Sequence, residues 1–435
     1  MNIAFHKHTL ANGLDVLLHE DRSCPIVAVN LWYHVGSKNE VPGRTGFAHL
    51  FEHLMFEGSQ HHDTGYFPPI QGAGGTLNGS TNADRTNYWE VVPSNALELA
   101  LWMESDRMGF LLPALTEAKF SNQRDVVLNE RRQNYENRPY GLAPMAMLAA
   151  LFPGDHPYHW TTIGEIADLH AARIEDVRAF FSTYYHPANA SLAIAGDIDP
   201  EQTLALVRAY FEELPPGPHV ARLSVPTPAL TREQRLVLED RVELPRLHLA
   251  WLSPAMFAPF DAELDLAADI LANGKTSRLY RRLVYDQRLA TDVSAAQNSR
   301  ELTGFLQVAA TAAPGHTLAE LERIIVEEIA RLAAEGPTED EIERCRVQAE
   351  AQFIFRLQNV GGFGGKSDQL NAYNTFTGDP AYFMEDLARY QRVTAGSLQE
   401  AVQRYLTTPH RVVLSVVPRG RVVLGMPDSS PAQVS

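Results

Sequence analysis

The sequence predicts an α+β fold of two similar domains, each a mainly antiparallel sheet packed with helices. Three observations support this prediction. A proline-rich stretch, residues 215–232, divides the 435 residues nearly in half, and its prolines exclude a helix interior or a central strand. The two halves share a faint internal repeat. Within each half, runs typical of strands alternate with runs of helical periodicity.

The internal repeat appears at both ends of each half. Glu-Asp-Arg followed by proline and an apolar strand occurs at residues 20–32 and again at 239–251. A helix ending in tyrosine, then proline and a strand, occurs near residues 184–195 and again near 405–416. We therefore predict domains at 1–214 and 233–425, the linker 215–232 between them, and a frayed polar tail at 426–435.

The elements of the first half follow from local pattern. Met1–Leu18 is strand-like with a turn at Asn12-Gly13, and Ile26–Tyr33 is a second apolar strand. Apolar residues recurring at three and four predict helices over Ala96–Met108 and Thr116–Tyr135.

Composition and charge exclude several classes of function. Lys and Arg number 37 against 53 Asp and Glu, a net charge of −16, which argues against nucleic acid as a partner. The longest apolar stretch, Leu142–Phe152, contains a proline and is far shorter than the roughly 20 residues of a membrane span, so no membrane is expected. Cys24 and Cys345 form no CxxC pattern and are expected in the core.

The start of the chain lacks the basic leader and apolar core of a signal peptide. We therefore expect a cytoplasmic protein, or a periplasmic one if a leader has been removed.

The segment from Gly46 to Gly58 is predicted to form a helix with two distinct faces. Its apolar residues recur at helical spacing and form a stripe expected to be buried. The other face carries His49, Glu52 and His53. Imidazoles four residues apart project from one side of a helix, close enough to bind one metal ion, with the carboxylate beside them. The pattern H-x-x-E-H therefore predicts a metal site.

A third metal ligand must come from another segment, because a catalytic zinc takes three protein ligands and keeps one position open for water. We expect a carboxylate. The helix predicted over residues 116–135 offers Glu130, with Gln123 two turns earlier on the same side. Glu117 and Glu136, nearer the ends of that helix, remain alternatives on spacing alone.

Residues 49–53, followed by the stretch RDVVLNE at 124–130, resemble the pitrilysin family of inverted-motif zinc metallopeptidases. That family includes insulysin and the mitochondrial processing peptidase. The resemblance covers nearly the whole chain, because the family's unit is a pair of similar α+β domains joined by a linker.

This resemblance implies roles for individual residues. His49, His53 and Glu130 would bind one Zn²⁺ per chain, and Glu52 would be the general base acting on zinc-bound water. Many relatives have a Glu seven residues before the third ligand, where this chain has Gln123, which can still orient His53 by hydrogen bonding.

The segment Gly75–Asn82 resembles the family's edge strand beside the zinc ion. An edge strand can bind an extended peptide through backbone hydrogen bonds. Asn78 is the expected anchor, with Gly79 and Ser80 beside it. The alternative is an ordinary hairpin with Asn78-Gly79 as its turn.

The second half lacks these groups. Glu263–Asn273 stands where the metal helix would be and has Ala and Leu at the places of the ligands, so one site per chain is expected. Relatives often carry in this half an Arg and a Tyr that bind substrate or stabilise the oxyanion, where this chain has Val284 and Thr291.

The chain is half the length of relatives that enclose a chamber with four domains, and half-length relatives form the chamber by dimerising. The resemblance therefore implies a heterodimer whose homologous non-catalytic subunit supplies the Arg and Tyr, or a homodimer.

We predict a zinc-dependent endopeptidase that hydrolyses peptides or short unfolded polypeptides in an enclosed chamber. The alternative is a non-catalytic structural subunit of a processing-peptidase-like complex.

Gly361–Ser367 resembles a phosphate-binding loop, but its glycines do not have the spacing that such a loop requires. A flexible turn near the chamber or near packing helices is expected instead. His61, His62, His156 and His159 lie in loops and are expected to be ordinary surface or turn residues.

Overall fold

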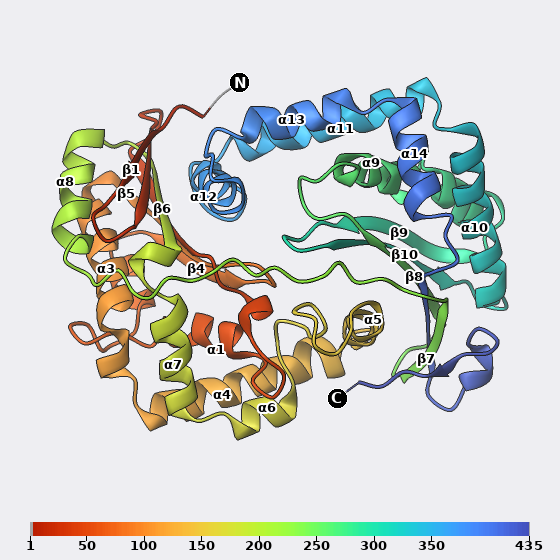
Figure 1. Cartoon of the computed structure of the whole chain (residues 1–435), viewed down its shortest axis with the longest axis horizontal. Helices are drawn as coiled ribbons and strands as arrows, with labels where there is room; N and C mark the ends of the chain where they lie inside the picture. The colour runs from red at the N-terminus through yellow and green to blue at the C-terminus, as the bar shows by residue number, and fades with distance from the viewer. Residues whose placement is uncertain (1–2, 435) are drawn as a thin grey trace. The chain divides into compact units, whose positions relative to one another are not determined.

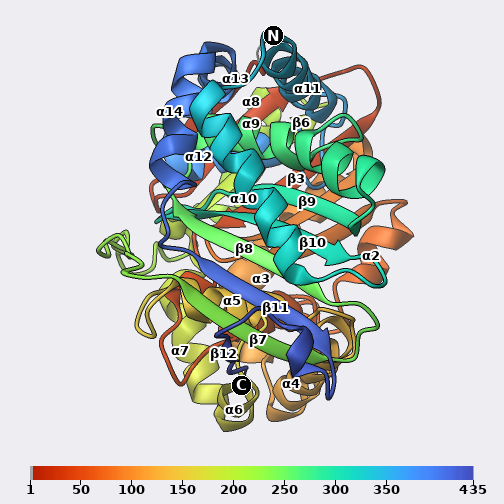
Figure 2. The same cartoon turned by 90° about the vertical axis from the view of Figure 1, so that its right-hand side faces the viewer.

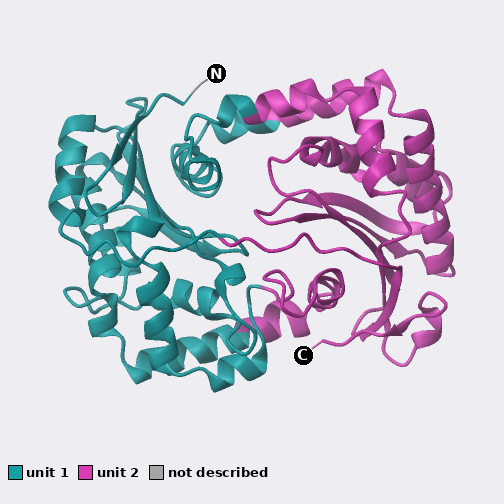
Figure 3. Cartoon of the chain, viewed as in Figure 1, with its two compact units in different colours: residues 1–129, 162–222, 352–385 teal, residues 130–161, 223–351, 386–435 magenta. Residues whose placement is uncertain are grey.

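The computed structural model describes residues 3–434 and groups the chain into two compact units (Figure 3). Unit 1 comprises residues up to 129, with 162–222 and 352–385, and unit 2 comprises 130–161, 223–351 and the residues from 386 onward. The division of the sequence into domains at 1–214 and 233–425 stays a prediction. Each compact unit contains segments from both of these ranges. Residues 1–2 of the predicted first domain and residue 435 of the predicted tail lie outside the described part.

Unit 1 is built on a six-stranded sheet with the strand order β1-β2-β6-β3-β5-β4 (Figure 1). Neighbouring strands are antiparallel except β2 and β6, which are parallel. The strands are β1 His6–Thr9, β2 Asp15–Glu20, β3 Ile26–Tyr33, β4 Thr76–Thr81, β5 Thr86–Pro93 and β6 Ala190–Gly196. The order leaves β4 at one edge of the sheet.

The two faces of this sheet contact different helices, as alternating side chains of β5 reveal. Glu90 contacts Arg107 of α3 (Leu97–Ala114), whereas Asn87 donates to Asp368 of α12 (Lys366–Thr377). Helix α12 comes from the second half of the sequence and packs on β2, β6 and β3. Both sides of the central strands are therefore covered, which suits their nearly continuous burial.

The remaining helices of unit 1 surround the α3 side and the ends of the sheet. Helix α3 is longer than predicted, but Phe110 (φ −133°) interrupts its helical geometry close to the expected end at Met108. The helix predicted over residues 116–135 is α4, Glu117–Arg131, continued by a π-helical turn at Arg132–Glu136; its residues from 130 onward belong to unit 2. The others are α1 Phe47–Leu54, α2 Phe67–Gly72, α6 Ile166–Ala171, α7 Ile174–Tyr184 and α8 Pro200–Phe211.

Unit 2 repeats the topology of unit 1 over five strands; the outer strand differs, because β12 is parallel to β7 whereas β1 is antiparallel to β2. Its sheet has the order β12-β7-β11-β8-β10-β9, which can be followed in Figure 2. The pair β7–β11 is parallel, as is β2–β6 in unit 1, and β8, β10 and β9 follow antiparallel, as do β3, β5 and β4. The strands are β7 Gln234–Asp240, β8 Arg246–Ser253, β9 Ala290–Asn298, β10 Gly304–Ala312, β11 Val412–Pro418 and β12 Ser430–Pro431. The two similar α+β domains predicted from the repeat are confirmed.

The core of unit 2 lies between the sheet and three helices, and it includes the fully buried Leu264, Ile325 and Val402. A helix from the first half of the sequence, α5, contacts β7, β8 and β11. The helices are α5 Ala143–Leu151, α9 Asp261–Ala272, α10 Leu318–Glu335 and α14 Ala395–Tyr405. Two more helices, α11 Glu339–Arg356 and α13 Phe383–Arg392, each have residues in both units.

Three expectations need correction. The helix expected over residues 46–58 ends at Leu54, and Gly58 adopts a positive φ of 101°. The tail is not frayed, because Ser430 and Pro431 pair with β7 and the Ala432 amide donates to Val237. Cys345 is buried as expected, but Cys24 is exposed. None of the helices within residues 3–434 has the length and apolar content required to span a membrane.

Candidate metal centre

Helix α1 is fixed by its apolar face and by its first turn. The Phe51 ring stacks on Phe180 at 5.9 Å between ring centroids, and the predicted apolar stripe is buried. The buried Glu40 carboxylate accepts hydrogen bonds from the amides of Gly46 (2.9 Å) and Ala48 (2.8 Å). A negative charge at a helix N-terminus is stabilising. The opposite face of α1, which carries His49, Glu52 and His53, is thus held in a defined orientation.

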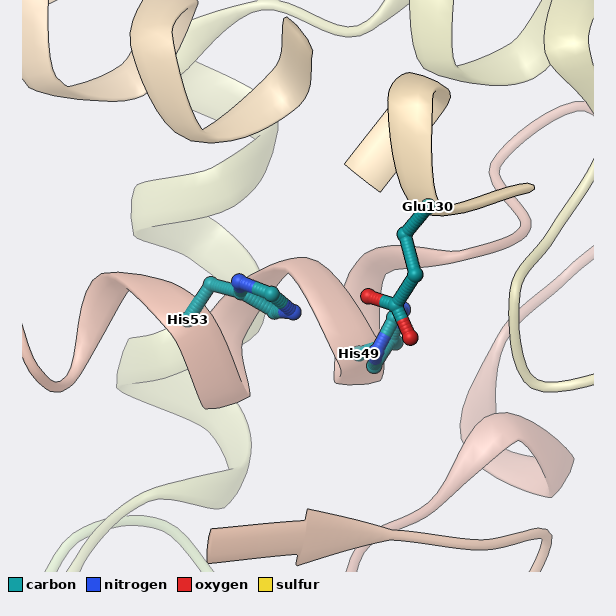
Figure 4. A group of neighbouring side chains, drawn as sticks. All are labelled: His49, His53 and Glu130. Carbon is teal, nitrogen blue, oxygen red and sulfur yellow. The ribbon is translucent and has the colours of Figure 1, made fainter. Parts of the chain in front are cut away.

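His49, His53 and Glu130 come together. One potential ligand atom from each lies within 4.8 Å of the others. The two imidazole rings are nearly perpendicular (89°), with centroids 4.8 Å apart. Figure 4 shows the Glu130 carboxylate, from the last turn of α4, beside His49, with the His53 ring directed toward them. Two imidazole nitrogens and one carboxylate oxygen are a ligand set that suits zinc and leaves a coordination position open.

The alternative third ligands and the loop histidines stand apart from this cluster. Glu136 pairs with Arg131 (3.3 Å), and Glu117 lies in the first turn of α4. Over residues 3–434, His49, His53 and Glu130 are the one group with metal-binding geometry. His61 pairs with the buried Asp106, so the loop residues have other contacts.

Two amide side chains, one on each side of Glu130 in the sequence, donate to carboxylates. Gln123 donates to the Glu57 carboxylate at 2.6 Å, so the structure records a partner other than the predicted His53. The orienting role of Gln123 toward His53 stays a prediction. Asn134, four residues after Glu130, donates to the Glu130 carboxylate at 3.1 Å. Sequence reasoning missed Asn134, although residues at i and i+4 of a helix lie on one side. It also missed Glu40, which lies outside α1.

Glu52 lies among buried tyrosines and a partly buried cation. Burial raises the pKa of Tyr88 and of Tyr185, and the negative charge of Glu52 contributes in the same direction. Burial lowers the pKa of Arg85, whereas the negative charges of Asp368 and Glu52 oppose that shift. The Tyr88 hydroxyl donates to the Phe51 carbonyl of α1 at 3.4 Å. Glu52 itself is partly exposed, so it lies between these buried side chains and solvent.

The predicted edge strand is β4. Asn78 pairs with Trp89 and Gly79 with Tyr88 inside the β4–β5 ladder, so Asn78-Gly79 is not a turn. The Asn78 side chain accepts a hydrogen bond from the Gly79 amide (2.9 Å), and Ser80 donates to Asn87 (2.7 Å). A role for Asn78, Gly79 and Ser80 in substrate binding stays a prediction.

In unit 2, the segment expected at the place of the metal helix is α9, which carries no histidine. Val284 lies in a π-helical segment, Tyr280–Asp286, and Thr291 lies in β9.

Two family models match this chain. The family model described as "Insulinase (Peptidase family M16)" matches residues 15–157, and "Peptidase M16 inactive domain" matches residues 172–348. An uncharacterized zinc protease, ML0855 of Mycobacterium leprae, is 30% identical over 348 residues, which cover 78% of this chain and 75% of that protein. The chain belongs to the M16 peptidase family.

Two further proteins resemble it over most of their length. Zinc protease PqqE of Helicobacter pylori is 29% identical over 365 residues, covering 82% of this chain and 81% of that protein. The crystal structure of a protease from Helicobacter pylori matches with a TM-score of 0.86 at 26% identity, covering 96% of this chain and all of that one. M16 membership confirms the resemblance found in the sequence and the α+β fold. The relatives' names support assignment to the zinc proteases, a class of hydrolases.

Proposed function

We propose that this M16 protein is a zinc-dependent endopeptidase that hydrolyses peptides or short unfolded polypeptides. The observation that carries the proposal is the convergence of His49, His53 and Glu130 within 4.8 Å, with Glu52 on the same helix as the two histidines. A bound zinc ion would lower the pKa of a coordinated water and polarise the peptide carbonyl.

The chain's own residues supply the proton transfers and the orientation. Glu52 would take a proton from the attacking water and return it to the leaving amine as the peptide bond breaks. Glu40, by holding the first turn of α1, would keep Glu52 and the histidines in register. The edge strand β4 would bind the peptide as an added strand, with Asn78 as its anchor and Gly79 and Ser80 beside it.

We further propose that the functional protein is a dimer. Val284 and Thr291 stand where the family's substrate-binding Arg and Tyr are expected, so a homologous subunit would supply those groups. The presence of Val284 and Thr291 in place of the Arg and Tyr also supports a second candidate function, that of a non-catalytic subunit. Comparing peptidase activity of the purified chain alone with its activity in the presence of such a subunit separates a complete enzyme from a dependent one.

Metal analysis combined with a quenched-fluorescent peptide assay tests the central proposal. Glu52→Gln should retain zinc, but its kcat should fall by a factor of about 10²–10⁴, as expected for loss of a general base. His53→Ala and Glu130→Gln should lose zinc and activity together. Glu117→Gln, on the same helix as Glu130, is the matched control and should keep both. Full activity in Glu52→Gln at equal zinc content would exclude Glu52 as the base.

A further inference from the structure

The glycine-rich segment 359–365 of unit 1 is anchored to the sheet. The Lys366 amide donates to Asn359 (2.9 Å), and the Ser367 amide donates to Val360 (3.0 Å). Gly361 lies so close to β3 and β5 that a Cβ would come within 2.5 Å of Ala28 Cβ and 2.6 Å of Val91 Cγ2. Only glycine allows this approach. The segment is thus built to lie on one face of the sheet.

Asp368, in the first turn of α12, fixes the segment to the same face. One carboxylate oxygen accepts from the side chains of Asn30 (3.1 Å), Trp32 (2.8 Å) and Asn87 (3.2 Å). The other accepts from the Gly364 amide at 2.8 Å. Charge-assisted hydrogen bonds of this kind hold geometry strongly. The position of the residue before Gly364 is thereby restricted.

That residue is Phe363, and half of its surface (50%) is exposed although its backbone is anchored. Its ring meets the Trp89 ring edge-to-face, with centroids 5.5 Å apart. Trp89 pairs with Asn78 of β4, and directly paired residues of neighbouring strands project on the same face of a sheet. Phe363 and Trp89 therefore form an apolar surface on the face that Asn78 and Ser80 share, next to the edge where a peptide would add.

We propose that Phe363 and Trp89 form an apolar subsite that receives one side chain of the peptide bound along β4. This inference rests on the proposed function and deepens it by naming the substrate class, which is peptides with a large aliphatic or aromatic residue at one position. Side chains of an added strand alternate between faces, so those beside Asn78 and Ser80 face the two rings. A charged side chain there would lose hydration without gaining a partner.

Pairs of fluorogenic peptides that differ at one position, Phe or Leu against Ser, test the subsite in the zinc-loaded protein. We expect the wild type to favour the apolar peptide at one position by about tenfold or more in kcat/KM. Phe363→Ala should reduce that preference by about three- to tenfold, mainly through a lower kcat/KM for the apolar peptide, and keep the zinc content. Phe363→Leu should restore most of the preference.

Phe355→Ala is the matched control, because Phe355 is a similarly exposed phenylalanine (56%) of unit 1 that lies on helix α11 and not in the segment 359–365. It should leave the preference unchanged. An unchanged preference in Phe363→Ala, or an equal loss in Phe355→Ala, would overturn the subsite.

A binding measurement separates failure of the subsite from failure of the proposed function. Fluorescence anisotropy of the same labelled peptides, measured in the Glu52→Gln background, should show a several-fold weaker Kd for the apolar peptide when Phe363→Ala is added. If the zinc-loaded wild type cleaves no peptide either alone or with a homologous subunit, the endopeptidase proposal fails, and the anisotropy comparison alone decides the subsite. Equal Kd values with and without Phe363→Ala would then refute it.

Discussion

Asp368→Asn tests whether the polar contact between α12 and the sheet holds unit 1 together. The carboxylate accepts four hydrogen bonds, three from side chains on β3 and β5 and one from the Gly364 amide. Asparagine has nearly the same volume but replaces one acceptor oxygen with a donor. If the new amide nitrogen faces Gly364, one bond is lost and two donors oppose each other. If it faces the sheet, three bonds are disturbed.

The expected loss of stability is worked out for the orientation that disturbs fewer hydrogen bonds, in which only the bond to the Gly364 amide is lost. Losing one bond to a charged acceptor and leaving its donor unsatisfied costs about 1.5–3 kcal/mol. The remaining bonds also lose their ionic character, and the partly buried Arg85 loses a nearby negative charge. We therefore expect the free energy of unfolding to fall by about 2–4 kcal/mol. Urea unfolding followed by tryptophan fluorescence measures it, and Trp32 reports directly because its indole donates to Asp368.

Asp379→Asn serves as the control. Asp379 is exposed and accepts only from a turn amide, that of Ala381, among the recorded contacts of its side chain. Its replacement should change stability by about 0.5 kcal/mol or less. If Asp368→Asn were as stable as this control with the same dependence on urea, the argument that this carboxylate fixes α12 to the sheet would be wrong.

Two further predictions concern ionisable and polar side chains elsewhere. Burial, with the charge of Arg246 adding, lowers the pKa of His248 to about 3; because the unfolded chain binds this proton near pH 6.5, stability should fall on acidification from about pH 6 to pH 4, by at most about 1.4 kcal/mol per pH unit. Urea unfolding across that range should give a shallower pH dependence for His248→Gln than for the wild type, and parallel curves would contradict the assignment. Gln123→Glu replaces the hydrogen bond to Glu57 with two opposed carboxylates and should cost about 1–3 kcal/mol at pH 8. This cost should shrink toward pH 5 as one carboxyl binds a proton, so a loss independent of pH would refute the predicted repulsion.

Local pattern predicted the two faces of α1 and named Glu130, which the structure brings close to His49 and His53; that these three residues bind a metal ion stays a prediction. Periodicity separated the buried stripe of α1 from the face bearing His49 and His53, because the two faces of a helix are defined by residues within two turns of one another. Glu130 emerged from the same kind of argument, although spacing alone left Glu117 and Glu136 open. The pairing that selects Glu130 depends on how α4 packs beside α1, and no periodicity within one helix records that.

The contacts that sequence reasoning missed join residues far apart in the chain. Asp368 binds Asn30 across 338 positions, and nothing near either residue indicates the other. The end of α1 was misjudged because apolar residues continue past Leu54 while the backbone turns toward Gly58. The polar tail was expected to fray because its composition conceals the backbone hydrogen bonds that attach it to β7.

The placement of α12 on the first sheet has a consequence for how the protein is made. On the ribosome, all six strands of that sheet are available once residue 196 has emerged, yet the helix that covers one face follows about 170 residues later. Until then, Trp32 and its neighbours on that face remain open to water and to other chains. A nascent chain in this condition is vulnerable to aggregation, so synthesis speed and chaperone access should influence the yield of native protein more than the stability of the finished fold would suggest.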